Sequence, residues 1–188
     1  KDELERSNID HIYAIGDACE GAPELMPVAQ KSGKLLAHRI HERMKGEKSE
    51  QEILDAFSTD FSSIPSTVFS PTEYSFAGLS EQEAIKEFGE DNVEVYHREV
   101  TPLQFSIVKG NTKSSYMKVI CHGERVVGMH FLGPSADEVI AGYAVAMKLG
   151  LKKEHLDGAV GVHPSTSEEF FNMEVTKRSG DDYIKTDC

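Results

Sequence analysis

The stretch that decides the fold is residues 115–132, which read SYMKVICHGERVVGMHFL. Its two halves, Ser115–Cys121 and Arg125–Leu132, are rich in the β-branched and aromatic residues that favour strands. The three residues between them, His122-Gly123-Glu124, have the length of a hairpin connection. This stretch therefore predicts two neighbouring antiparallel strands.

More strands and helices are expected on both sides of this hairpin. Three helices are expected, over 80–89, over 135–150 and from 164–167 to about 179; the first two begin with a Ser-x-x-Glu capping box. Because most strands are joined by short turns, residues 64–180 predict a largely antiparallel sheet flanked by helices, an α+β fold. The other strand candidates are Ser66–Phe69, Tyr74–Gly78, Val93–Glu99 and Leu103–Val108.

Residues 1–46 carry a different pattern. His11–Ile15 (HIYAI) predicts a short apolar strand that stops at Gly16-Asp17. Pro27 suits the first turn of a helix, and apolar residues then recur at helical spacing until Gly46. We interpret residues 47–63 as a polar connector and residues 181–188 as a C-terminal tail.

Charge and cysteine content limit the classes of function. The chain has 20 Lys and Arg against 32 Asp and Glu, a net charge of −12, which disfavours binding to nucleic acid or to an anionic membrane. The three cysteines form no CxxC pair, and the 8 histidines show no metal-ligand spacing, so we expect a reducing compartment and no metal site. The chain does not start with Met, and we interpret it as part of a longer protein.

The N-terminal pattern contains a candidate cofactor wall. Asp17 follows a predicted strand, where its carboxylate could bind sugar or ribityl hydroxyls or could only cap the turn. The backbone N–H groups of Leu25, Met26 and Val28 are expected to be free at the start of the following helix. The positive end of that helix would stabilise electron density on a ligand.

A second constellation is Gly161–Glu168 (GVHPSTSE). His163 is a candidate proton donor and acceptor, and Glu168, five residues on, could hold one ring nitrogen and fix the tautomer. The alternative is a loop histidine before a helix, with Glu168 stabilising only the helix start. Spacing alone favours this simpler alternative.

These segments together resemble a known family. The chain is similar to the C-terminal portion of FAD-dependent pyridine nucleotide-disulfide oxidoreductases, and the resemblance covers nearly its whole length. A tail ending in Cys188 makes it most like the large thioredoxin reductases and thioredoxin-glutathione reductases. The segments that carry the resemblance are His11–Asp17 (HIYAIGD), Glu24–Ala29 (ELMPVA), Gly133–Glu138 (GPSADE), Gly161–Pro164 (GVHP) and Val175–Gly180 (VTKRSG).

The resemblance implies a division of labour. By the resemblance, residues 1–46 are the last strand and helix of an FAD-binding domain, and residues 64–180 are the homodimerisation domain. His163 becomes the proton acceptor and donor at the partner subunit's active site, beside the cofactor, with Glu168 orienting it. FAD and the electron donor NADPH are implied, with thioredoxin as substrate; the NADPH domain is absent from this chain. The implied FAD contacts are Gly16, Asp17, Glu24, Leu25, Met26 and Pro27.

The C-terminal end has its own implication. Cys188 falls on the first cysteine of the family's Gly-Cys-Cys-Gly or Gly-Cys-selenocysteine-Gly arm, so it would be redox-active and a selenocysteine codon would follow. Two positions depart from the family pattern: Met26 stands where Thr is common, and Asp187 where Gly is usual. The alternatives are glutathione reductase or another sister reductase, or a dimerisation module without activity. The chain alone is expected to be inactive, and its compartment to be the cytosol or the mitochondrion.

Overall fold

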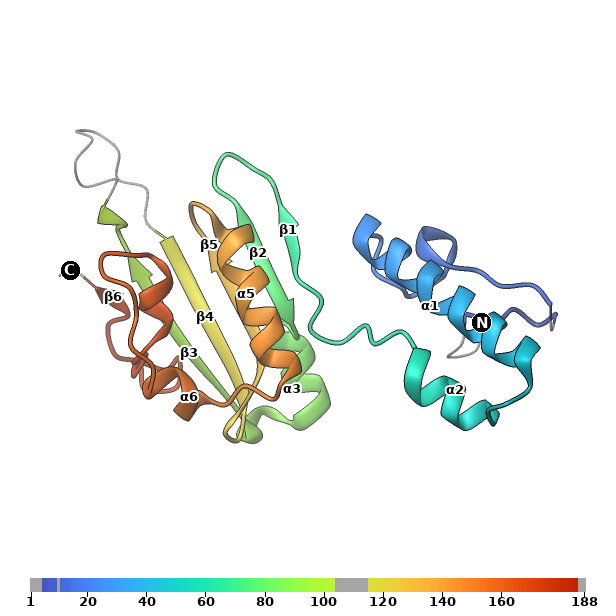
Figure 1. The fold of residues 1–188 in the computed structure, drawn as a ribbon. Coiled ribbons are helices and arrows are strands. Elements are labelled where there is room, and N and C mark those ends of the chain that lie inside the picture. Colours follow the sequence, from blue (N-terminus) through green and yellow to red (C-terminus); the bar gives the residue numbers. More distant parts are fainter. Residues whose placement is uncertain (1–4, 10, 104–114, 186–188) are drawn as a thin grey trace. The chain divides into compact units, whose positions relative to one another are not determined.

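The computed structural model describes residues 5–9, 11–103 and 115–185 (Figure 1). The chain divides into two compact units, Lys1–Phe61 and Ser62–Cys188. None of the described helices combines the length and the apolar character needed to cross a membrane. Each unit is considered by itself below.

The second unit is built on a six-stranded sheet with the order β1-β2-β5-β4-β3-β6. All neighbouring strands are antiparallel except β3 and β6, which are parallel. This confirms the predicted α+β fold with a largely antiparallel sheet. The strands are β1 (Ser66–Val68), β2 (Tyr74–Gly78), β3 (Val93–Val100), β4 (Ser115–His122), β5 (Arg125–Leu132) and β6 (Ile184–Lys185).

Helices cover both faces of this sheet. Helix α5 (Ala136–Lys148) lies across one face, over β2 and β5 (Figure 1). Helix α3 (Glu81–Phe88) begins with the predicted capping box, and its buried Ala84 packs with Ile120. Alternate residues of β4 belong to the core beneath α5, because successive side chains of a strand point to opposite faces. A short helix, α6 (Lys153–Asp157), completes the unit.

Cys121 belongs to the core beneath α5 and is 1% exposed. Burial raises the pKa of its thiol from 9.0 to about 12. Between these values the unfolded chain loses the proton and the folded chain keeps it, so stability falls by about 1.4 kcal/mol per pH unit as pH rises. Burial also raises the pKa of four tyrosines, so we expect urea unfolding at pH 9.5 and 10.5 to show a steeper fall in stability for the unsubstituted chain than for Cys121→Ala, by about this amount. Equal slopes in both proteins would contradict the buried-thiol assignment.

Two expectations for this unit need correction, and a third is not tested. Ser135 has a φ of 56°, and its side chain makes no capping hydrogen bond to α5. The helix expected from 164–167 to about 179 is only the 3-10 turn η3 (Ser167–Phe170), because Phe171 is extended and Asn172 has a φ of 54°. The expected strand Leu103–Val108 lies, apart from Leu103, outside the described residues.

The first unit pairs α1 (Met26–Lys45) with α2 (Glu50–Phe57). Helix α1 has Pro27 in its first turn and stops at the left-handed Gly46, as predicted. The segment 47–63, interpreted as a connector, contains α2, which opens with a capping box of Ser49 and Glu52 that the sequence analysis missed.

The strand expected at His11–Ile15 is not formed among the described residues. A single antiparallel bridge joins Tyr13 to Arg6 instead. A strand needs a ladder of hydrogen-bonded partners, and one bridge does not supply it.

Candidate functional site

The loop 161–168 brings His163 and Glu168 together. Nδ1 of His163 lies 3.2 Å from each carboxylate oxygen of Glu168. The same carboxylate accepts the Ser165 N–H at 2.9 Å, and the Ser165 hydroxyl oxygen accepts the Glu168 N–H at 3.2 Å. The contact between histidine and carboxylate considered from the sequence is therefore present. It directs an Nδ1 proton toward Glu168 and makes Nε2 the ring nitrogen suited to proton exchange.

The loop is anchored to rigid parts of the second unit. A Cβ at Gly161 would lie 2.5 Å from the Cβ of Glu168, so only glycine allows the loop to pass this closely. The hydroxyl of Tyr143, on α5, donates to the carbonyl oxygen of Ser167 at 3.2 Å. The ring of Phe170 is fully buried, 5.0 Å from the ring of Tyr143. These contacts hold the loop against α5 and the core.

His163 stands at the edge of a cavity of about 310 Å³. The side chain of His163 is 67% exposed, whereas that of Glu168 is 22% exposed. The ring can therefore exchange a proton with a group brought to it from outside this unit. The cavity is lined by Val100, Thr101, Pro102, Leu103, His163, Pro164, Ser165, Thr166, Glu168, Glu169 and Lys185.

In the first unit, Gly16 and Asp17 form the short 3-10 turn η1 (Gly16–Ala18) against α1. Gly16 has a φ of 60°, and a Cβ there would lie 2.8 Å from the Cβ of Ala29. Both observations require glycine at this position. Asp17 is exposed, so its carboxylate can accept hydrogen bonds from a ligand.

The start of α1 differs in one respect from the expectation. The Leu25 N–H donates to the carbonyl oxygen of Pro23 at 2.9 Å and is not free. The N-cap, Leu25, provides no side-chain cap, so Met26 and Val28 keep the backbone N–H groups that a helix leaves unpaired in its first turn. Met26 is 66% exposed. This end of α1 therefore suits an electron-rich group.

Comparison with known proteins identifies the family. Residues 64–174 match the family model described as the pyridine nucleotide-disulphide oxidoreductase dimerisation domain. The chain belongs to this oxidoreductase family. It is also 43% identical, over 195 aligned positions, to Thioredoxin reductase SEP1 of Emiliania huxleyi. That alignment covers 98% of this chain and 37% of the relative, so the chain spans little more than a third of the relative's length.

The oxidoreductase family match confirms the resemblance drawn from the motifs. It covers β1 to β5, α5 and the loop with His163 and Glu168, whereas β6 lies beyond its end. The first unit lies outside the family model but inside the alignment with the reductase, which spans nearly the whole chain. The roles of individual residues in this oxidoreductase stay predictions.

Sequence reasoning missed three charged residues beside this site. Glu169 follows Glu168 directly, and its carboxylate is paired with Arg98 and with Lys185. The only signal in the sequence was a second acidic residue beside Glu168. Its partners lie 71 and 16 residues away, and helix or strand periodicity predicts no pairs at such separations.

Cysteine and metal chemistry are limited in the described part of this oxidoreductase chain. Cys19 and Cys121 are buried free thiols. Cys188 and Asp187 lie outside the described residues. Within residues 5–9, 11–103 and 115–185, no group of three or more His, Cys, Asp or Glu is placed to hold a metal ion.

Proposed function

We propose that this chain is the C-terminal part of an FAD-dependent, NADPH-driven thioredoxin-disulfide reductase that works as a homodimer. The pairing of His163 with Glu168, inside a domain of this oxidoreductase family, carries the proposal. The 43% identity to a thioredoxin reductase favours thioredoxin as the substrate.

In this proposal His163 handles the proton of dithiol–disulfide exchange. When a thiol attacks a disulfide, its proton passes to Nε2, and the ring then returns a proton to the sulfur that leaves. Glu168 keeps the other ring nitrogen protonated and the ring in place. Because the ring is largely exposed, the reacting sulfurs come from outside this unit, and we assign them to the partner subunit.

The first unit fits part of a flavin site. The exposed carboxylate of Asp17 suits ribityl hydroxyls, and the N–H groups of Met26 and Val28 suit negative charge on the flavin ring. The other proposed flavin contacts are Gly16, Glu24, Leu25 and Pro27. When bound, FAD supplies electron transfer from NADPH, and Cys188 receives electrons at the C-terminal arm.

The dimer surface is proposed to include α5. Val145, on α5, and Leu149, the residue directly after its end, are 62% and 84% exposed and lie one turn apart, so they form one apolar stripe. Val160 and Val162, on the loop before His163, are also largely exposed. Large exposed apolar surface is typical of protein–protein contacts.

Leu149→Asp is expected to raise the dimer dissociation constant about 30-fold or more, because it places a charge in a desolvated interface. Sedimentation velocity over a concentration series measures this change. Lys86→Ser, at an exposed position of α3, is the matched control and should leave the dimer intact. A dimer unaffected by Leu149→Asp would show that this stripe is not the interface.

The function itself is tested with the flavoenzyme that contains this chain. NADPH oxidation is followed with thioredoxin and, separately, with glutathione disulfide. Turnover with thioredoxin supports the proposal. Turnover with glutathione disulfide alone would assign the chain to a sister reductase, and a dimer inactive on both would leave a dimerisation module.

A further inference from the structure

Glu169 is a nearly buried carboxylate that joins three segments of the second unit. It is 7% exposed. Its Oε2 lies 3.0 Å from Nη1 of Arg98, on β3, and its two oxygens lie 2.9 and 3.0 Å from Nζ of Lys185, on β6. Arg98 also donates to the carbonyl oxygen of Asn172 at 3.0 Å, which ties down the turn after η3. We call Glu169, Arg98 and Lys185 the carboxylate clamp.

Strand β6 depends on side-chain anchors of this kind. It contains two residues, paired in parallel with β3 at Glu99 and Val100, and such a short strand has little stability of its own. The ring of Tyr183 stacks on that of His97 with centroids 4.5 Å apart. The Glu99 N–H donates to the Tyr183 carbonyl oxygen at 2.9 Å.

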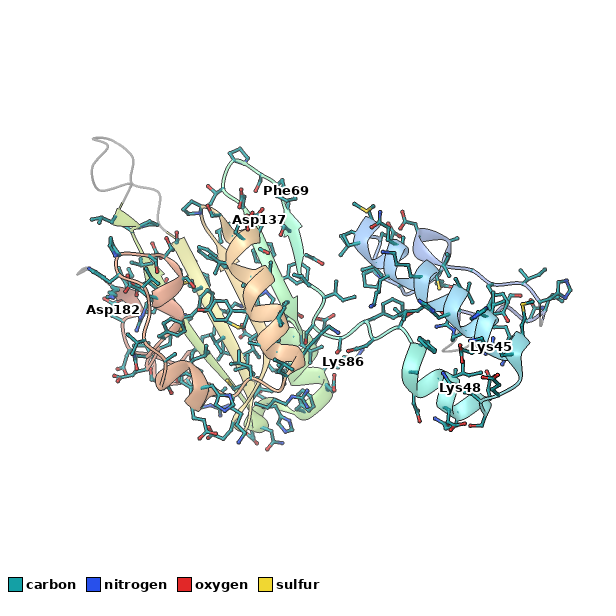
Figure 2. The ribbon with its side chains drawn as sticks, viewed as in Figure 1. Lys45, Lys48, Phe69, Lys86, Asp137 and Asp182 are labelled. Atoms are coloured by element: carbon teal, nitrogen blue, oxygen red, sulfur yellow. The ribbon has the colours of Figure 1, made fainter. Side chains whose placement is uncertain are left out.

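The residues before β6 add a local turn. The Asp182 Oδ1 accepts the Ile184 N–H at 3.0 Å, and Figure 2 shows Asp182 beside this part of the sheet. Together these contacts fix the chain up to Lys185.

The clamp lies beside the proposed proton-exchange site. Lys185 and Glu169 line the same cavity as His163 and Glu168. Glu168 contacts the histidine, and the adjacent Glu169 holds the root of the C-terminal segment. The two neighbouring carboxylates therefore link His163 to Lys185.

We propose that Glu169 is a positioning residue, whose clamp on Lys185 fixes where the C-terminal redox segment begins relative to His163. This inference rests on the proposed function and adds a residue to it. Lys185 is the informative position for a test. Its side chain is 36% exposed, and Arg98 stays with Glu169 when the lysine is lost, so Lys185→Met leaves no buried carboxylate without a cation.

The first measurement is amide hydrogen exchange in the full chain. Lys185→Met is expected to speed exchange of the Glu99 amide about 5-fold, because β6 opens more often. Lys185→Arg, which restores a cation, should exchange as the unsubstituted chain does. The Leu79 amide, which donates to the Val127 carbonyl oxygen at 2.8 Å, is the internal control and should not change.

The second measurement uses the flavoenzyme that contains this chain. Lys185→Met is expected to lower kcat for thioredoxin about 10-fold, since misplacing a reacting group by about 1 Å has larger effects still. Ferricyanide, which takes electrons from the flavin directly, should be reduced at the unchanged rate, and Lys185→Arg should recover thioredoxin turnover.

The outcomes separate this inference from the proposed function. The positioning role would be overturned if the Glu99 amide exchanged at an unchanged rate in Lys185→Met. It would also be overturned if Lys185→Arg lost as much thioredoxin turnover as Lys185→Met, or if Lys185→Met lost ferricyanide reduction to the same extent as thioredoxin reduction. Failure of the unsubstituted enzyme to reduce thioredoxin would overturn the proposed function instead. The exchange data would then still decide whether the clamp seats β6.

Discussion

In the proposed thioredoxin reductase, His163→Gln is expected to lower kcat for thioredoxin reduction by about 10²- to 10⁴-fold, the range for loss of a positioned acid–base group. Glutamine keeps a polar side chain of similar reach but cannot exchange a proton near neutral pH. The ring it replaces is held by both oxygens of Glu168, so its position is defined before any substrate arrives. Steady-state NADPH oxidation with thioredoxin measures the loss.

Two variants show whether the loss comes from proton exchange. Glu168→Gln should also reduce kcat, because the amide lacks the carboxylate charge that holds the proton on Nδ1 and stabilises the protonated ring. Ser165→Ala removes one half of the reciprocal cap on Glu168 but leaves the carboxylate, and should cost less than about 3-fold. In stopped-flow measurements, the rate at which NADPH reduces the flavin should be the same in all three variants as in the unsubstituted enzyme. A His163→Gln enzyme with normal thioredoxin turnover would remove His163 from the proposed mechanism.

The sequence predicted several features that depend on neighbours along the chain, although it missed the capping box of Ser49 and Glu52 and predicted one at Ser135 that is not formed. The hairpin at 123–124 followed from two apolar runs and a short turn, and the capping box of Ser80 and Glu83 followed from its spacing. The contact between His163 and Glu168 is also local, since a turn and the start of η3 bring residues five apart together. Spacing alone favoured the simpler alternative, and the structure supplied the contact.

Features that depend on distant partners were missed. The clamp joins Glu169 to Arg98, 71 residues earlier, and only the fold brings these two side chains together. The predicted helix after Pro164 failed for a related reason. Tertiary packing buries Phe170 and Met173 and overrides the local helical pattern. The apolar pattern of His11–Ile15 is typical of a strand. Among the described residues, however, it pairs only through one bridge and not with a neighbouring strand.

The first unit contains a buried ion pair that joins three of its segments. Arg39, on α1, is fully buried and pairs with Glu5, which is 2% exposed. Its Nη1 also donates to the carbonyl oxygen of Phe57 at 2.6 Å, at the end of α2. Thr59 donates its hydroxyl to the other oxygen of Glu5 at 2.7 Å. This network has no signature in the sequence, because its members lie 34 and 18 residues apart.

Arg39→Met is expected to destabilise the first unit by about 3–5 kcal/mol, because it leaves the buried Glu5 carboxylate without its cation. Two buried thiols report the two units separately: Cys19, 3% exposed, lies in the first and Cys121 in the second. Alkylation of Cys19 should accelerate roughly 10²-fold or more, up to the rate of a free thiol, while Cys121 stays protected. Mass spectrometry of quenched samples gives both rates.

A matched arginine on the same helix provides the control. Arg43 pairs with Glu50 at the surface, where their side chains are 22% and 51% exposed, so Arg43→Met should cost less than about 1 kcal/mol and change Cys19 alkylation little. Adding Glu5→Gln to Arg39→Met should restore part of the protection, since the buried group is then uncharged. Equal losses of stability in Arg39→Met and Arg43→Met would mean that burial does not increase the contribution of the Arg39–Glu5 pair to stability. The stability of the first unit would then have to come from the packing of α1 on α2 alone.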